Sequence, residues 1–253
     1  MGNDYFRLNL SGSKESINIY GPPQTKEVVD AAFHYIAVSV RPFVAQNPAG
    51  YRMVNGDLVN PFAVHEFDHD GVIFQDDKVR VVAAENTHYS FLAPQDRAQI
   101  KSYSYRFETP HGVVVFTGDT GPSDAVARLA KGADVLVAEV TNRNAEEVDR
   151  LVNSMAAENH WPPARVRAFR AHMQMQHLDT NTVGQLAGQA KVKAVVLYHY
   201  VPRDKADAEG YVAEVRKSFS GPVFAPADLD RYCLQAKAGG SQPAAPLSAC
   251  GKP

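Results

Sequence analysis

Short, wholly apolar runs recur along this chain and alternate with segments of helical periodicity. Three of these runs lie at residues 113–116, 135–140 and 192–197. A run of four to six residues suits a strand better than a helix, and a strand without polar alternation is typical of one buried on both faces. Helical spacing fills much of the sequence between and after them. Strands that alternate with helices predict a layered α/β domain.

The first part of the chain adds further elements to this pattern. A short strand is expected at 17–20, followed by the turn Gly21-Pro22-Pro23, and apolar residues at helical spacing predict a helix over 25–40. We expect this helix to end before Pro42, since proline lacks the backbone N–H that a helix interior needs. Residues 63–83 carry strand patterns that turn at Asp76-Asp77.

The expected organisation is one domain over 1–233, with a flexible Gly/Pro/Ala-rich tail over 234–253. The tail region contains both cysteines, Cys233 and Cys250. A disulfide between them would indicate an oxidising compartment such as the periplasm, whereas two free thiols would suit the cytoplasm. The sequence leaves both the pairing and the compartment open.

Composition narrows the classes of partner. The chain has 253 residues, 45% of them hydrophobic and 21% charged, with a net charge of −2. These are ordinary values for a globular protein, and the charge gives no reason to expect nucleic acid as a partner. We find no apolar run near the roughly 20 residues that span a bilayer. The chain is therefore expected to be soluble, without a membrane partner, and to act on a small molecule.

Three polar residues follow three separate predicted strands. His88 comes after 79–84, Asp119 after 113–117 and His199 after 192–198. Loops at strand ends are where a rigid sheet presents reactive groups. Two imidazoles and a carboxylate are a ligand set for zinc, manganese or iron. Taken singly, each histidine is more often an ordinary surface or core residue.

The surrounding strings make the pattern more specific. Phe116-Thr117-Gly118-Asp119-Thr120 places a glycine before the acid, where a tight turn can aim the carboxylate inward. Glu139 follows the next apolar run, His177 precedes a helix start capped by Asp179 or Thr180, and His199 precedes Val201-Pro202. In this order, with Gly-Pro-Pro ahead of them, these features resemble the ribonuclease Z-like and arylsulfatase-like branch of the metallo-β-lactamase superfamily.

This resemblance implies a fold and a set of roles. The fold would be the α/β metallo-β-lactamase-like αββα sandwich. His88 and His199 would be metal ligands, and Asp119 would bridge two metals. His177 would donate a proton or stabilise charge near the scissile bond, and Glu139 would orient it.

The superfamily's His-x-His-x-Asp-His string is absent from these 253 residues. The nearest string, His65-Glu66-Phe67-Asp68-His69, keeps only its Asp-His end and lies after Gly-Pro-Pro instead of before it. We interpret His65 and His69 as residues of an exposed β-hairpin, with His65, Asp68 and His69 as weaker candidates for substitute ligands. The domain is thus expected to be truncated at its amino end. An exposed sheet edge would favour a homodimer.

Two functions compete on this basis. The first is a hydrolase of broad specificity, in which one or two ions, Zn²⁺ before Mn²⁺ or Fe, activate water against an ester, phosphoester or related bond. The second is a catalytically inactive remnant that binds a ligand or has a structural role, because a fold does not establish an activity. An RNA-processing nuclease ranks third, since no basic arm is evident.

Overall fold

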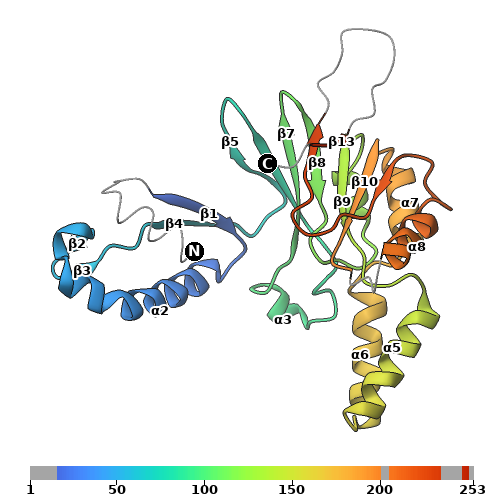
Figure 1. Ribbon diagram of the computed structural model, residues 1–253, viewed down its shortest axis with the longest axis horizontal. Helices are drawn as coiled ribbons and strands as arrows, with labels where there is room; N and C mark the ends of the chain where they lie inside the picture. The colour runs from blue at the N-terminus through green and yellow to red at the C-terminus, as the bar shows by residue number, and fades with distance from the viewer. Residues whose placement is uncertain (1–15, 201–204, 235–246, 251–253) are drawn as a thin grey trace. The chain divides into compact units, whose positions relative to one another are not determined.

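The computed structural model describes residues 16–200, 205–234 and 247–250 (Figure 1). Its contacts divide the chain into two compact units, where the sequence led us to expect a single domain. The first unit comprises Met1–Asp68 with Ala98–Ile100, and the second comprises His69–Arg97 with Lys101–Pro253.

The first unit is built from a parallel strand pair and one long helix. Its elements are β1 (Ile17–Gly21), α2 (Thr25–Gln46), a 3-10 turn (Pro48–Gly50), β2 (Met53–Val54), β3 (Asp57–Leu58) and β4 (Phe62–Glu66). Strand β1 pairs with β4, and β2 with β3. The small core of this unit centres on Val29 and Val40 of α2 and Phe62 of β4.

Helix α2 corrects one prediction, because it continues past Pro42 to Gln46. Pro42 leaves one carbonyl of the preceding turn without its partner, but this part of the helix is exposed, where water replaces the bond. By length and composition alone, α2 also meets the criterion for crossing a membrane, with a mean hydropathy of 1.3 over 18 residues. Charged residues divide this segment, so its sequence contains no uninterrupted apolar run of that length. A helix that packs one face on a core passes the same test.

The second unit is built on a seven-stranded mixed sheet of order β11-β10-β9-β8-β7-β6-β5. Strands β5 to β8 run antiparallel to their neighbours, whereas β8 to β11 are parallel. The strands are β5 (Gly71–Gln75), β6 (Arg80–Glu85), β7 (Tyr103–Thr109), β8 (Gly112–Phe116), β9 (Val135–Glu139), β10 (Ala194–Tyr198) and β11 (Val223–Phe224).

Helices cover one face of this sheet, and a short strand pair packs against residues of the other. The apolar runs predicted from the sequence lie at its centre in β8, β9 and β10, where Val115, Leu136 and Leu197 are fully buried against the helices. Alternate residues of the same strands, such as Val135 and Val196, pack with β12 and β13. The remaining elements are α3 (Pro94–Arg97), α4 (Asp124–Leu129), α5 (Ala145–Glu158), α6 (Pro163–Met175), α7 (Thr180–Ala190), α8 (Lys205–Val215), β12 (Tyr232–Leu234) and β13 (Leu247–Ala249).

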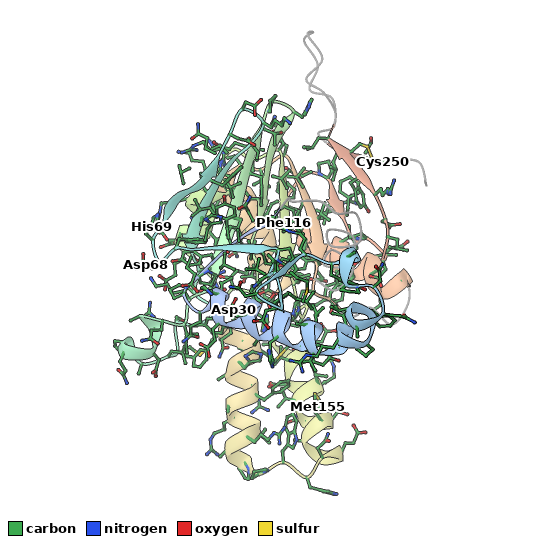
Figure 2. All side chains as sticks on the ribbon, turned by 90° about the vertical axis from the view of Figure 1, so that its left-hand side faces the viewer. Asp30, Asp68, His69, Phe116, Met155 and Cys250 are labelled. Carbon is green, nitrogen blue, oxygen red and sulfur yellow. A yellow bond between two sulfur atoms is a disulfide. The ribbon has the colours of Figure 1, made fainter. Side chains whose placement is uncertain are left out.

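Two expectations about loops and tail differ from what the structure shows. Strand β13 pairs with β12, and Cys233 is joined to Cys250 (Figure 2), so part of the expected flexible tail is ordered on the sheet. The rest of it, 235–246 and 251–253, lies outside the described residues. The expected hairpin around His65 and His69 is wrong, because β4 pairs with β1 and β5 with β6.

Helices α5 and α6 form a hairpin that extends away from the sheet, with Met155 toward its free end (Figures 1 and 2). A cluster of Val148, Val152 and Met173, with Val166 and Phe169 packed against it, holds the two helices together. An ion pair between Arg170 and Asp149 adds a contact at 2.6 Å. The hairpin leaves the sheet just after β9 and returns just before His177, so its base borders the residues described next.

Candidate metal centre at the strand ends

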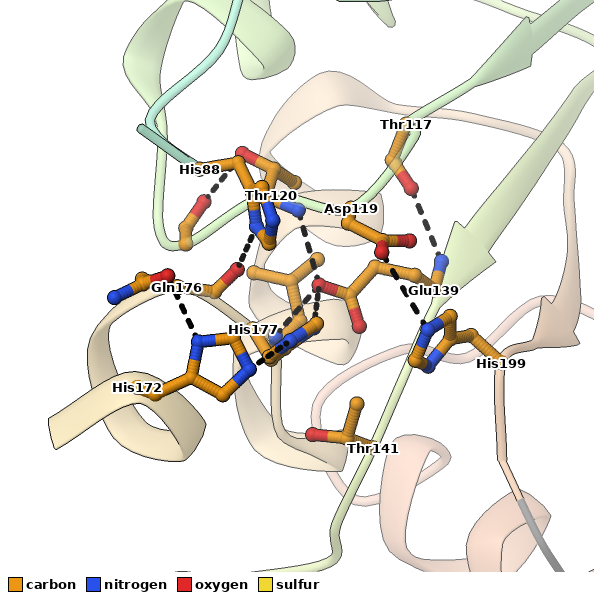
Figure 3. A network of polar contacts seen from close by, with 12 residues as sticks. His88, Thr117, Asp119, Thr120, Glu139, Thr141, His172, Gln176, His177 and His199 are labelled. Atoms are coloured by element: carbon orange, nitrogen blue, oxygen red, sulfur yellow. Dashed lines mark hydrogen bonds and ion pairs between the residues drawn. The ribbon is translucent and has the colours of Figure 1, made fainter. Parts of the chain in front are cut away.

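Polar side chains from four strands meet at one edge of the large sheet. Strands β6, β8, β9 and β10 all point their carboxyl ends to this edge, because β6 and β8 are both antiparallel to β7. His88 and Asp119 each lie three residues beyond a strand, Glu139 is the last residue of β9, and His199 directly follows β10. The predicted strand ends therefore bring the predicted residues to one region (Figure 3).

The loop after β8 is shaped by close packing of its backbone. Gly118 has φ 61°, and a Cβ at this position would lie 2.9 Å from the carbonyl oxygen of Tyr103. The buried Thr117 Oγ1 accepts a hydrogen bond of 3.0 Å from the backbone N–H of Glu139. Asn86 Nδ2 donates to the Thr117 carbonyl at 3.2 Å. Beyond this turn, Asp119 Oδ2 lies 3.4 Å from His199 Nε2.

Glu139 is a fully buried carboxylate at the centre of the cluster. Its Oε1 accepts two backbone N–H groups, from Thr120 and from Leu178, each at 3.1 Å. These two hydrogen bonds hold the carboxylate in place. Its Oε2 is buried and has no hydrogen-bond partner among the described residues.

His177 lies against Glu139, with its Nδ1 3.3 Å from Glu139 Oε1. The two atoms form a close pair without the alignment of a hydrogen bond, so Nδ1 is also a buried atom without a hydrogen-bond partner among the described residues. On the other side of the ring, His177 Nε2 lies 3.3 Å from His172 Nε2. His172 Nδ1 in turn contacts Gln176 Oε1 at 2.8 Å.

The other two imidazoles flank this chain of contacts. His88 Nδ1 lies 2.9 Å from the carbonyl oxygen of Gln176, which leaves Nε2 as its free ring nitrogen, and its ring centre lies 5.2 Å from that of His177. His199 Nε2 lies 3.4 Å from Asp119 Oδ2. Its backbone is left-handed, with φ 64°, a conformation that costs a non-glycine residue energy and recurs at functional sites.

Burial also changes the titration of one nearby phenol. Desolvation is the main cause that raises the pKa of Tyr198 to about 12, and the charges of Asp119 and Glu139 raise it further, against a hydrogen bond with Thr117 that lowers it. Tyr198 is therefore a neutral hydroxyl at the edge of the cluster at ordinary pH.

The residues that come close enough to share an ion differ in part from the predicted set. The ligand atoms of Glu139, His177 and His199 lie within 4.8 Å of one another, and no other such group of three occurs in the described part of the chain. Asp119 touches this group through His199, whereas His88 reaches it only by ring contact with His177.

The weaker ligand candidates lie elsewhere in the chain. His65 belongs to β4, where its ring stacks on Tyr20 at 4.7 Å and its Nε2 contacts Asn18 Oδ1 at 2.9 Å. Asp68 closes the main segment of the first unit, and His69 opens the second. None of the three belongs to the donor group formed by Glu139, His177 and His199, so their role as substitute ligands stays a prediction.

A small hollow of about 240 Å³ adjoins the cluster at the base of the helical hairpin. It is lined by His177 together with residues from α5, α6 and α7 and the loops before them, among them Asn142, Met173 and Asp179. This volume suits a small chemical group more than a large ligand.

Sequence reasoning missed His172 and Gln176. His172 contacts His177 and Gln176, and the backbone carbonyl of Gln176 contacts His88. The spacing of His172 and Gln176, one helical turn apart and just before His177, was a signal that could have found them.

These features define an α/β fold with a histidine and carboxylate cluster at its strand ends. The sequence model of the Beta-lactamase superfamily domain matches residues 4–200. The chain belongs to this superfamily of metal-dependent hydrolases. Ribonuclease Z of Mycobacterium tuberculosis H37Rv is 28% identical over 234 residues, covering 88% of this chain and 71% of that protein. Ribonuclease Z of Mycobacterium marinum is 26% identical over 233 residues, covering 90% of this chain and 71% of that protein.

Solved structures agree on the fold. The metallo-β-lactamase fold protein YhfI of Bacillus subtilis superposes with a TM-score of 0.54 at 14% identity, covering 88% of this chain and 66% of that chain. The short form of human tRNase Z superposes with a TM-score of 0.50 at 17% identity, covering 89% of this chain and 70% of that one. Both likenesses concern the α/β fold.

Proposed function

We propose that this protein is a metal-dependent hydrolase that uses metal-activated water against an ester, phosphoester or related bond. The observation that carries the proposal is the strand-end cluster, in which a fully buried carboxylate faces imidazoles and keeps one oxygen without a hydrogen-bond partner among the described residues. Burying such groups costs free energy unless a proton or a cation compensates them. Membership of a superfamily of metal-dependent hydrolases supports the cation.

The ligands that the family resemblance implies are His88, Asp119 and His199. Imidazole and carboxylate donors fit Zn²⁺ best and also accept Mn²⁺ or Fe. When bound, such an ion supplies a lowered pKa for a coordinated water and polarises the bond under attack. His199 and Asp119 have side chains that are 42% and 37% exposed, so a substrate can approach them from solvent.

His177 is the residue placed to assist the leaving group. Glu139 lies against one side of its ring and His172 against the other, which fixes the ring plane (Figure 3). A positioned imidazole beside a cleaved bond can hold or release a proton there. Glu139 then acts as the orienting carboxylate, and the backbone groups of Thr120 and Leu178 hold it in place.

Two alternatives remain in view for specific reasons. The relatives named ribonuclease Z favour an RNA substrate, whereas the net charge of −2 weighs against a polyanion. The absence of a His-x-His-x-Asp-His string from the 253 residues favours a binding protein without turnover, because the resemblance implies metal ligands in that string. A homodimer also stays a proposal, and a monomeric mass in light scattering would contradict it.

The test combines metal content with hydrolysis. Metal per chain is measured by mass spectrometry for wild type, Asp119→Ala and His199→Ala, and a panel of small carboxylesters and phosphoesters is assayed before and after chelation. We expect stoichiometric metal in wild type, loss of metal in both variants, and activity that chelation abolishes. Metal-free wild type without turnover would favour the binding protein. Activity insensitive to chelation would refute the proposed mechanism. A tRNA precursor in the panel addresses the nuclease.

A further inference from the structure

Helix α2 carries two apolar stripes, and only one of them packs on the core of the first unit. The packed stripe comprises Val29, Phe33, Ile36, Val40 and Val44. The other stripe is exposed, and its large side chains Val28, Tyr35 and Val38 are 63%, 77% and 44% exposed. Large apolar side chains that gather on one exposed face mark a surface of interaction, whereas single ones need no explanation.

The exposed stripe has the spacing of a coiled-coil seam. Its apolar residues are separated alternately by three and four positions, as in the a and d positions of a heptad repeat. All of its members are exposed, namely Val28, Ala31, Tyr35, Val38, Pro42 and Ala45. With a rise of about 1.5 Å per residue, the seam is about 26 Å long. A seam of this kind is buried when a second helix with the same repeat lies along it.

The residues beside the seam distinguish the two orientations that such a pair can take. Glu27, His34 and Arg41 each directly precede an a residue, so they occupy the g positions of the repeat. In an antiparallel pair, g positions face g positions, and Glu27 then lies opposite Arg41 of the second copy. In a parallel pair they face e positions, which hold the uncharged Ala32, Ser39 and Gln46.

Both charges are free to make this contact. Neither Glu27 nor Arg41 has an ion-pair partner among the residues that the structure describes, whereas Lys26 of the same helix is paired with Asp30. Glu27 and Arg41 are 14 positions apart, or about 21 Å along the helix, so they cannot pair within one chain. Their charges are complementary only between two copies.

We propose that a second copy of this chain covers the exposed stripe of α2, and that the two α2 helices form an antiparallel pair. The register that joins Glu27 to Arg41 makes every layer of the seam apolar. Its layers are Tyr35 with Val38, Ala31 with Pro42 and Val28 with Ala45, each formed twice across the twofold axis. The small side chain of Ala31 leaves room for the ring of Pro42. The dipoles of the two helices also oppose each other, which is the favourable arrangement for neighbours.

A lipid surface is the other occupant that an apolar helix face suggests, since α2 also meets the length and composition criterion for a membrane span. Helices that lie on a membrane surface carry mainly Lys and Arg on their polar face. The charged residues of α2 are the basic Lys26 and Arg41 and the acidic Glu27 and Asp30. This balance favours a second copy over an anionic membrane.

This inference goes beyond the proposed hydrolase and does not depend on its metal. It also differs from the homodimer argued from a sheet edge, because it assigns the contact to one helix face and fixes the register of that contact.

The first test measures the dissociation constant of the dimer by sedimentation equilibrium on the full chain. Wild type should be dimeric at micromolar concentrations. Tyr35→Glu should weaken the dimer at least about a hundredfold, because it places two carboxylates in an apolar seam. Phe91→Glu is the matched control, since Phe91 is an aromatic residue outside α2 that is 57% exposed, and it should leave the dissociation constant unchanged.

The second test addresses the register by charge reversal. Glu27→Arg or Arg41→Glu alone turns both interchain pairs into like charges and should weaken the dimer about tenfold. The double variant restores opposite charges and should return the dissociation constant to within about threefold of wild type. Both positions are exposed, so these variants remain informative if Tyr35→Glu fails to fold, which circular dichroism would reveal.

Three results would overturn the inference. A monomeric wild type would do so, and binding of that monomer to vesicles of phosphatidylcholine and phosphatidylglycerol, lost in Tyr35→Glu, would assign the stripe to lipid instead. A dimer that persists in Tyr35→Glu would place the contact on another surface, such as a sheet edge. A double variant no tighter than the single reversals would refute the antiparallel register. Chelator-sensitive hydrolysis would survive each of these results, so the two proposals fail separately.

Discussion

Glycine is required at position 118, in the turn before Asp119, for two separate reasons. Its φ of 61° is left-handed, and the carbonyl oxygen of Tyr103 occupies the space that a Cβ would need. Gly132 has nearly the same φ, 66°, but a Cβ added there would meet no atom of the described residues within 4 Å. Comparing substitutions at Gly118 and Gly132 therefore separates the cost of backbone strain from the cost of crowding.

We predict that Gly132→Ala lowers the free energy of unfolding by about 1–2 kcal/mol, the cost of a left-handed alanine. Gly118→Ala should cost about 1–3 kcal/mol more, because the added methyl group must displace Tyr103. Denaturant unfolding measures both. Metal binding should weaken in Gly118→Ala alone. Equal losses of stability in the two variants would show that the crowding is relieved without cost.

The free energy of unfolding should depend on pH through Tyr198. Its pKa is raised from 10.0 to about 12, so the folded chain favours the neutral phenol. The sign follows from linkage: this stability is fully present below pH 10 and is lost as the pH rises toward about 12. Tyr198→Phe should therefore lose less stability than wild type between pH 9 and about pH 12 in denaturant titrations. Parallel curves for the two proteins would contradict the burial of this hydroxyl.

At the scale of elements, the helical hairpin has a core of its own. Val152 is fully buried between α5 and α6, whereas Leu151, its neighbour in the chain, is 42% exposed. Val152→Ala should cost about 1–3 kcal/mol of hairpin stability, and Leu151→Ala less than about 0.5. Hydrogen exchange should show faster opening of α5 and α6 in the first variant, with β8 to β10 unchanged. Faster exchange across the sheet would mean that the two cores unfold as one.

The helices and strands of the second unit agree best with the predictions made from the sequence. The apolar runs became the central parallel strands because such runs are buried wherever a sheet is covered. The cap predicted at Asp179 is confirmed, because its side chain accepts the backbone N–H of Thr182. The predicted end of α2 before Pro42 was wrong. A proline on an exposed turn of a helix costs less free energy than a proline in a buried turn.

Residues of the candidate site could be predicted only where the neighbouring sequence pattern pointed to them. His88, Asp119, Glu139 and His199 could be found because each lies at the end of a strand or soon after it. The contact between His88 and Gln176 joins residues 88 positions apart, and no local periodicity reports such a distance. The pairing of β4 with β1 instead of β5 likewise depends on a segment more than forty residues away.

For the whole molecule, the Cys233–Cys250 disulfide fastens β12 and β13 over one face of the large sheet. It joins residues 17 positions apart, so closing this loop stabilises the fold by about 3 kcal/mol in the chain-entropy account. We predict that reduction lowers the free energy of unfolding by about 2–4 kcal/mol. Unfolding with and without reductant, with thiol alkylation as the readout of reduction, provides the measurement. Unchanged stability in fully alkylated protein would show that the β12–β13 pair holds without its covalent link.

The α5–α6 hairpin interrupts the chain between two parts of one centre, since it departs soon after Glu139 and returns just before His177. A protruding insertion that is anchored at both ends in a rigid site can change length without moving its anchors. Residues facing each other across the hairpin could be removed in pairs, one turn at a time, down to the level of His172. Mutation can thus adjust how far the hairpin extends beyond the strand-end cluster without changing the residues at its base.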